Sequence, residues 1–146
     1  MRLATDSETC TIVRSGVTAW SYPRLPGSAA QARHDVAELL RLAARNRDLS
    51  FVLVQVVSEL VTNVIQHADG TDSVRVELAL SNGAIRLDVS DQHPGRPEEL
   101  PLSDDDESGR GLWIVWHLTR ELGGQVVVLD AKQGGGKTIR VTLPGA

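Results

Sequence analysis

Hydrophobic and polar residues recur along this chain with two different periods, and each change of period marks a change between helix and strand. The segment SAAQARHDVAELLRLAARN has apolar residues at helical spacing, and its Ser28 and Gln31 have the spacing of a capping box. This pattern predicts an amphipathic helix that begins near Ser28.

A second helix is expected from about Ser50 to Ala68. Apolar side chains cover most of its circumference, and between Phe51 and His67 the only acidic or basic residue besides the histidine is Glu59. At roughly 100° per residue, the polar side chains share one narrow stripe. The stripe consists of Gln55, Glu59, Thr62, Asn63 and Gln66. A buried polar stripe needs polar partners or a ligand; from this helix alone, a stripe that faces solvent remains the alternative.

Period-two alternation predicts two strand pairs. SVRVELAL and AIRLDVS lie on either side of Asn82-Gly83, which is a strong hairpin signal. QVVVLD and KTIRVTL form a second pair around a glycine-rich turn. Residues 20–25 are expected to form a short edge strand, because prolines, which cannot donate to a ladder, end it.

The segment RGLWIVWHLTRELGG predicts a third helix that ends at Gly123-Gly124. The order helix, helix, hairpin, loop, helix, hairpin predicts an α+β fold. We expect a two-layer sandwich with three main helices on one face of a mixed, mostly antiparallel sheet. A doubly wound nucleotide-binding fold is not expected, because the strands pair through hairpins and not through helical crossovers.

The chain of 146 residues is long enough for one domain, which we place at residues 19–146 after a poorly ordered tail at 1–18. The net charge of −4 gives no electrostatic footprint for nucleic acid or an anionic membrane. A lone cysteine, Cys10, excludes an internal disulfide. The N-terminus lacks the apolar core of a signal peptide. The second helix carries too many polar residues to be expected to span a bilayer. These features favour a cytoplasmic protein.

Residues 92–109 read QHPGRPEELPLSDDDESG, and a loop of this length within a compact domain is commonly a lid or a binding loop. Asp91 ends a strand just before it, where its carboxylate can accept hydrogen bonds from an amine, and Gly95 would permit close approach of a flat ring. Taken alone, an aspartate before Pro-Gly is also an ordinary turn residue.

The loop ends in ESGRGLW, where Gly109 and Gly111 open the third helix. Free N–H groups and the positive end of the helix dipole make this position suitable for an anion, and Arg110 could add a charge-assisted contact. A simple hinge between loop and helix is the alternative. The segment GGGKTIRV is not a P-loop, because a strand and not a helix follows the Lys-Thr pair.

The second helix carries a carboxylate and an amide one turn apart, at Glu59 and Asn63. A carboxylate can act as a general base, and an amide oxygen is a neutral ligand suited to Mg²⁺. The order of four features, E-x-x-x-N on a helix, an aspartate at a strand end, a lid that ends in G-x-G-L, and a terminal G-K-T strand, resembles the Bergerat-fold (GHKL) ATP-binding superfamily. That superfamily includes gyrase, histidine kinases and mismatch-repair proteins. The branch that looks most similar is that of the bacterial anti-sigma-factor serine kinases, over roughly residues 20–143, with SELVTN and ESGRGL as the most specific parts.

The resemblance implies a role for each motif residue. Glu59 would orient or deprotonate the attacking hydroxyl, and Asn63 would bind the Mg²⁺ that bridges the phosphates. Asp91 would bind the adenine amino group of ATP, assisted by Thr138. The remaining nucleotide-binding residues that it implies are Gly95, Gly109, Arg110, Gly111 and Leu112, with an ATP lid at about 93–109.

Two positions depart from the family pattern. The pattern D-x-G-x-G has His93 where the first glycine would be, and Glu107 stands where some of these kinases have an arginine. A side chain at position 93 would either crowd the adenine or turn outward.

The resemblance implies an ATP-dependent serine/threonine protein kinase that works in a partner switch. Such a protein phosphorylates an anti-sigma-factor antagonist protein and binds a sigma factor. The alternative is a nucleotide-gated regulatory binding module without phosphotransfer activity, and a third possibility is a structural adaptor that has lost ATP. A homodimer is also implied by the resemblance alone.

Overall fold

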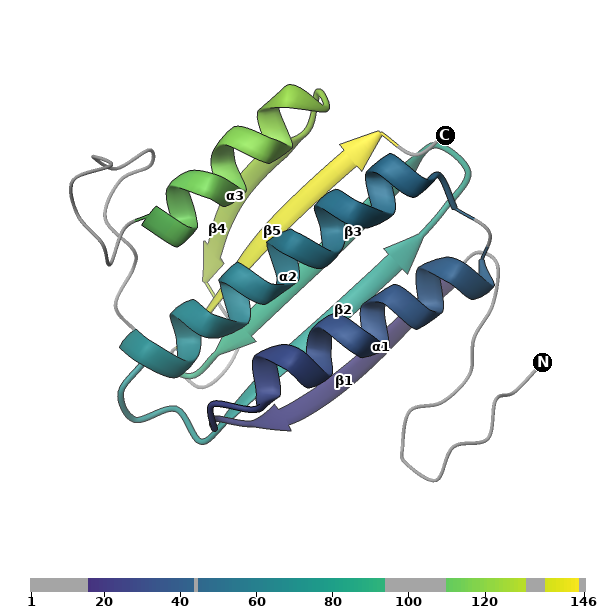
Figure 1. Cartoon of the computed structure of the whole chain (residues 1–146). Helices are drawn as coiled ribbons and strands as arrows, with labels where there is room; N and C mark the ends of the chain where they lie inside the picture. The colour runs from purple at the N-terminus through teal and green to yellow at the C-terminus, as the bar shows by residue number, and fades with distance from the viewer. Residues whose placement is uncertain (1–15, 44, 94–109, 131–135, 145–146) are drawn as a thin grey trace.

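The computed structural model describes residues 16–43, 45–93, 110–130 and 136–144 (Figure 1). Three helices and five strands make up these residues. In chain order they are β1 (Gly16–Pro23), α1 (Ser28–Leu42), α2 (Arg47–His67), β2 (Ser73–Leu80), β3 (Ala84–Asp91), α3 (Arg110–Glu121), β4 (Gln125–Asp130) and β5 (Lys137–Pro144).

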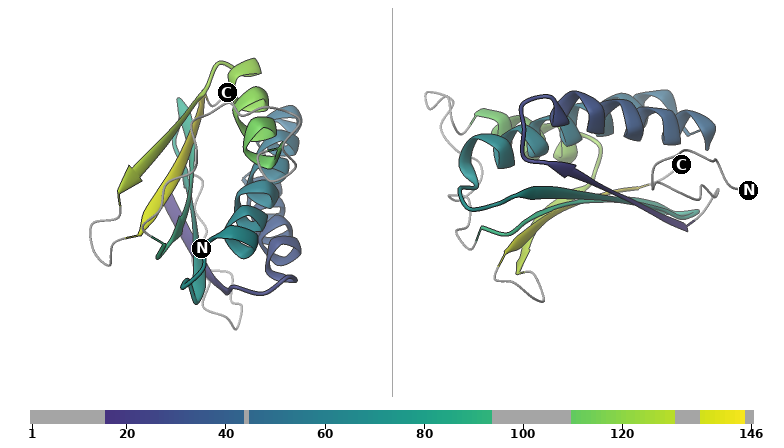
Figure 2. Two further views of the ribbon diagram at one scale, coloured as in Figure 1. Left: turned by 90° about the vertical axis from the view of Figure 1, so that its left-hand side faces the viewer. Right: turned by 90° about the horizontal axis from the view of Figure 1, so that it is seen from below.

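The strands form a single sheet in the order β1-β2-β3-β5-β4, and all four pairings are antiparallel. The helices cover one face of this sheet, as the two side views in Figure 2 show. The expected α+β two-layer sandwich is therefore confirmed. In place of the mixed, mostly antiparallel sheet that we expected, every pairing between the described strands is antiparallel, and the two pairs of consecutive strands, β2 with β3 and β4 with β5, are the ones that the sequence predicted.

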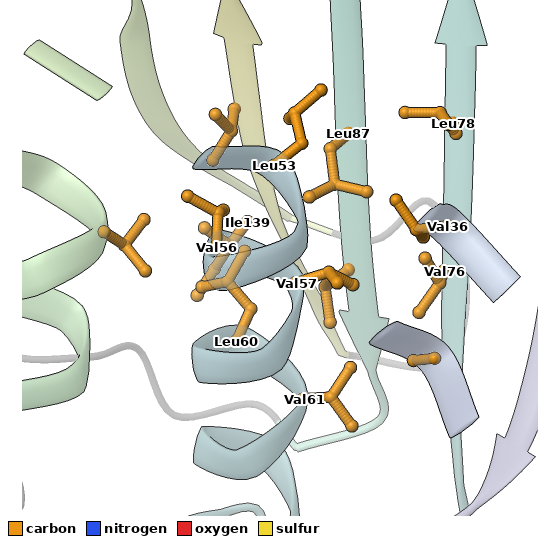
Figure 3. Packing of buried hydrophobic residues seen from close by; sticks show 14 of the residues in the cluster. Val36, Leu53, Val56, Val57, Leu60, Val61, Val76, Leu78, Leu87 and Ile139 are labelled. Atoms are coloured by element: carbon orange, nitrogen blue, oxygen red, sulfur yellow. The ribbon is translucent and has the colours of Figure 1, made fainter. Parts of the chain in front are cut away.

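The core lies between the helices and the inner face of the sheet, with α2 at its centre (Figure 3). Leu53, Val57 and Leu60 on α2 are fully buried, and Leu87 on β3 and Ile139 on β5 belong to the same cluster. By length and composition α2 would also be long and apolar enough to cross a membrane. In this fold its apolar surface is the centre of a two-layer core, which accounts for the same composition.

The first two helices begin differently from what the sequence patterns predict. Asn46 caps α2, since its side chain accepts hydrogen bonds from the backbone N–H groups of Asp48 and Leu49. The helix therefore begins at Arg47, ahead of the expected start. The predicted capping box at Ser28 is wrong, because the Ser28 hydroxyl donates to the Pro23 carbonyl oxygen instead. In addition, β1 begins at Gly16, inside the segment expected as a tail.

The third helix ends in the glycine pair as predicted. Gly123 adopts a positive φ of 77°, and the N–H groups of Gly123 and Gly124 donate to the carbonyl oxygens of Arg120 and Thr119. These two bonds form a Schellman motif. The glycine pair turns the chain directly into β4.

The buried side chains of α3 include Leu112 and Val115, and α2 is its main neighbour. The two tryptophans of α3 are only partly buried. Trp113 stacks on His117 with ring centroids 5.0 Å apart, and the Arg120 guanidinium lies 4.7 Å from the centre of the Trp116 ring. Both tryptophan side chains are therefore partly exposed.

Candidate functional site

Four chain segments that carry candidate residues meet at one end of the domain. The end of α2, the end of β3, the start of α3 and the start of β5 all lie at the same end of the sandwich (Figure 1). Antiparallel pairing of β3 with β5 requires that the last residue of β3 faces the first residue of β5. The fold therefore gathers motifs that are far apart in the sequence.

Glu59 and Gly111 are in direct contact. A Cβ atom added to Gly111 would lie 2.7 Å from Oε1 of Glu59, so only a glycine at this position leaves room for the carboxylate as it stands. The other carboxylate oxygen, Oε2, accepts a hydrogen bond of 3.2 Å from the Gln55 amide. The partly buried Glu59 carboxylate is thus held against the first turn of α3.

Asn63 lies one helical turn beyond Glu59, on the same side of α2. Its side chain is partly buried, and within residues 16–43, 45–93, 110–130 and 136–144 it has no hydrogen-bond partner. The amide oxygen is therefore available to a ligand. Within the same residues there is no group of three or more histidine, cysteine or acidic side chains that could hold a metal ion. A magnesium ion here would need ligands from a nucleotide's phosphates as well as from Asn63. Mg²⁺ in proteins is usually bound in this way, by few protein ligands together with substrate phosphates.

Asp91 is buried at the end of β3 and both of its carboxylate oxygens are engaged. Oδ1 accepts the backbone N–H of His93 at 2.8 Å. Oδ2 accepts a hydrogen bond from Nζ of Lys137 at 2.7 Å, and the two side chains are only 2% and 6% exposed. This buried ion pair directly joins the last residue of β3 to the first residue of β5.

Lys137 is a residue that the sequence reasoning missed. A signal for it was present, because Lys137, Ile139 and Val141 alternate with period two and the last two are core residues. Lys137 must therefore face the helices, on the same side as Asp91.

The resemblance implied that Thr138 assists Asp91 through water, and the structure shows where the Thr138 side chain lies. Thr138 is the cross-strand partner of Ser90, and their hydroxyl oxygens are 2.7 Å apart. Because successive residues of a strand point to opposite faces, this pair lies on the outer face of the sheet, away from Asp91 and the helices. The side chains of Thr138 and Asp91 therefore point to opposite faces of the sheet, and a role of Thr138 in adenine binding stays a prediction.

Gly136 brings the start of β5 close to the end of β3. A Cβ atom on Gly136 would lie 1.9 Å from the backbone oxygen of Asp91 and 2.8 Å from the Cα atom of Gln92. No side chain fits at that distance from a backbone atom. The glycine therefore permits the close approach that sets Lys137 opposite Asp91.

His93, which departs from the family pattern, turns away from the Asp91 carboxylate. Its Nδ1 atom lies 3.1 Å from the backbone oxygen of Asp69, in the connection between α2 and β2. The neighbouring Gln92 side chain bonds to the same connection, at Asp72 and Ser73. Of the two possibilities left open by the sequence, the outward orientation is the one observed.

The structure describes some of the residues that were predicted to bind phosphate. Arg110 and Gly111 form the start of α3, and the N–H groups of a first helical turn lack partners within the helix. The Leu112 side chain is buried in the core, so only its backbone is available to a phosphate. Gly95, Gly109 and the predicted lid from residue 94 onward lie outside the described residues.

These residues fit a magnesium nucleotide. A carboxylate touches the first turn of a helix, an amide without a partner in the described part of the chain lies one turn away, and a buried acid is positioned at a strand end. Together with the three-helix, five-strand antiparallel sandwich, they define a Bergerat-type ATP-binding domain. The sequence matches the histidine kinase-like ATPase domain family over residues 22–143, so the chain belongs to that family.

Solved structures agree with this assignment. The chain is similar to the mycobacterial sensor histidine kinase MprB, with 29% identity, 66% of this chain and 74% of that chain covered, and a TM-score of 0.50. It is also similar in fold to the RsbU and RsbW domains of Rv1364c from Mycobacterium tuberculosis, with 21% identity, 89% of this chain and 33% of that chain covered, and a TM-score of 0.65.

A curated relative covers a shorter part of the chain. It is the protein-L-isoaspartate O-methyltransferase of Methylorubrum populi, which is 34% identical over 82 residues. The match covers 55% of this chain and spans 39% of the length of that protein.

Proposed function

We propose that this protein is an ATP-dependent serine/threonine protein kinase of the anti-sigma-factor type. It phosphorylates a serine of an anti-sigma-factor antagonist protein and, after release of that partner, binds a sigma factor. The likeness to a structure that contains an RsbW domain supports this class of partner. A cytoplasmic location and a homodimer, both expected from the sequence or the resemblance, belong to the same proposal.

The observation that carries the proposal is the contact between Glu59 and Gly111. A general base must lie within reach of the hydroxyl that it deprotonates, and the transferred phosphoryl group must be held nearby. A Cβ atom on Gly111 would lie only 2.7 Å from Oε1 of Glu59. The Glu59 carboxylate therefore lies beside the helix turn whose N–H groups are available to phosphate oxygens.

In the proposed reaction, Glu59 accepts the proton of the attacking serine hydroxyl. The serine oxygen forms a new bond to the terminal phosphorus of ATP, the bond from that phosphorus to the bridging oxygen breaks, and ADP leaves with the electron pair. Asn63 holds Mg²⁺, which supplies charge neutralisation when it is bound. Gln55 positions Glu59 through the hydrogen bond to Oε2.

Transfer of radiolabelled phosphate from ATP to a candidate antagonist tests this function. Glu59→Gln keeps the size of the side chain and removes the base, so we expect transfer to fall about 10²–10⁴-fold while the Kd for Mg·ATP changes little. Glu77→Gln, on the outer face of the sheet, is the matched control and should transfer at the wild-type rate. A wild-type protein that binds Mg·ATP and its partner but transfers nothing would favour the nucleotide-gated binding module instead.

A further inference from the structure

The ion pair between Asp91 and Lys137 holds more hydrogen-bonding capacity than it uses. A lysine ammonium has three donors, and within the described residues Asp91 is its single acceptor. Each carboxylate oxygen can accept two hydrogen bonds, and here Oδ1 and Oδ2 each accept one. Lysine is almost never fully buried without partners for its charge. The pair therefore has donors and acceptors left for a ligand.

The burial of this pair is not explained by stability. Replacing a buried ion pair by apolar side chains of similar volume is often neutral or stabilising, because both charges lose their hydration. The neighbouring inward positions of both strands, Val89 and Ile139, are apolar and buried. Asp91 and Lys137 stand at the next cross-strand position, with Nζ of Lys137 2.7 Å from Oδ2 of Asp91. Two charged side chains at this buried position point to a role in binding a ligand.

The pair presents a donor and an acceptor side by side. The base-pairing edge of adenine carries the complementary set, since its 6-amino group donates and the adjacent ring nitrogen N1 accepts. An edge of this kind can form two parallel hydrogen bonds with the pair, in which Asp91 accepts from the amino group and Lys137 donates to N1. The close approach at Gly136 fixes the two side chains opposite one another, so the ligand does not have to organise them.

We propose that Lys137 is a base-recognition residue of the nucleotide site, whose ammonium group donates a hydrogen bond to N1 of adenine while Asp91 accepts one from the 6-amino group. This inference rests on the proposed binding of ATP. It adds Lys137 as the residue that donates a hydrogen bond to N1 of adenine. It also assigns to Lys137 a part in adenine binding like the one that the resemblance implied for Thr138.

Isothermal titration with two nucleotides tests the proposal. The probes are Mg·ATP and Mg·1-deaza-ATP, in which a C–H group replaces N1 and the 6-amino group is kept. We expect the wild-type protein to bind 1-deaza-ATP about 10- to 100-fold more weakly, because a hydrogen bond from a charged donor is lost. Lys137→Met lacks the donor, so it should bind ATP more weakly and should no longer distinguish the two nucleotides.

Two further variants serve as controls. Lys137→Arg keeps a charged donor and should retain the preference for ATP. Arg140→Met removes a cation from the outer face of the same strand and should leave both affinities unchanged. If Lys137→Met does not fold, the comparison of the two nucleotides on the wild-type protein still decides the question.

The outcomes separate this inference from the proposed function. Equal affinity of the wild-type protein for ATP and 1-deaza-ATP overturns the role of Lys137 and leaves ATP binding intact. Tighter binding of ATP by Lys137→Met than by the wild-type protein also overturns the role of Lys137. It would mean that the Lys137 ammonium competes with adenine for Asp91. A wild-type protein that does not bind ATP overturns both.

Discussion

Two ion pairs join the same two strands, β3 and β5, on opposite faces of the sheet. Asp88 and Arg140 face outward, whereas Asp91 and Lys137 face the helices. Each pair consists of directly opposed residues with an acid on β3 and a base on β5. The surroundings of the two pairs differ. The difference separates the structural pair, Asp88 and Arg140, from the pair for which we propose a role in adenine binding, Asp91 and Lys137.

The outer pair belongs to a network of four charged side chains, Asp88, Arg140, Arg86 and Glu77. Arg140 donates two hydrogen bonds, of 2.9 and 3.0 Å, to the two oxygens of Asp88. Arg86 lies 3.5 Å from Asp88 and 3.7 Å from Glu77. The hydrogen bonds to Asp88 raise the pKa of the Arg140 guanidinium, and the charges of Asp88 and Glu77 add to this while burial opposes it. The Arg140 side chain is 36% exposed, so water also satisfies it.

In the inner pair, Asp91 is the one acceptor of the Lys137 ammonium within the described residues, and both side chains are almost fully buried. Lys137 donates to one oxygen of Asp91, and its side chain is 6% exposed. A buried charge with one partner depends strongly on that partner. The outer pair therefore has a partly exposed cation and further charged neighbours, whereas the cation of the inner pair is buried and has hydrogen-bond donors left for a ligand.

The largest effect on stability is expected from Lys137→Ala. This change leaves the Asp91 carboxylate buried without its cation, so the free energy of unfolding should fall by about 3–5 kcal/mol. Urea denaturation followed by circular dichroism measures it. The double variant Asp91→Asn with Lys137→Met, which removes both charges, should recover most of the loss. If the double variant is as unstable as the single one, the pair's charges are not the reason for its sensitivity.

A smaller loss is expected from Gly136→Ala. The added methyl group would lie 1.9 Å from the backbone oxygen of Asp91, so the two strands must move apart. Overpacking of this kind costs about 1–3 kcal/mol, and the Kd for Mg·ATP should rise because Lys137 no longer stands opposite Asp91. Gly83→Ala, where no atom lies within 4 Å of the new methyl group, is the control. Equal behaviour of the two variants in denaturation would contradict the close contact at Gly136.

The smallest effect is expected from the outer face. Asp88→Asn keeps an acceptor for Arg140 and removes a charge that Arg140 and Arg86 share, so we expect a loss of about 1 kcal/mol. Because Arg140 is partly exposed, this loss should shrink further when urea denaturation is repeated at high salt. ATP affinity should not change. A loss as large as that of Lys137→Ala would remove the distinction between the two faces.

The elements of this fold follow from the sequence because each has a local signal. The alternation around Asn82-Gly83 predicted the hairpin of β2 and β3, and the glycine pair at Gly123 predicted the end of α3. The start of α2 was placed too late because the run of apolar residues begins after the helix does. Its true start depends on Asn46, whose capping role is a single polar contact.

Residues of the candidate site could be predicted where the helical or strand periodicity of a segment shows which face a side chain occupies. Glu59 was predicted from a polar stripe on an apolar helix and Gly111 from a glycine pattern at the start of the next helix, but their contact comes from the structure alone. The neighbour of Asp91 depends on the register between two strands that are 46 residues apart in the chain, and only the structure gives that register. Alternation along β5 alone would have favoured Lys137 over Thr138.

The partly exposed tryptophans of α3 give the protein a built-in optical probe. Trp113 lies two residues from Gly111, whose backbone touches the Glu59 carboxylate, and it stacks on His117. Indole emission responds to changes in such stacking and in exposure to water. Any occupant that displaces the first turn of α3 should therefore change the fluorescence of the unlabelled protein, and time-resolved mixing could follow its arrival directly.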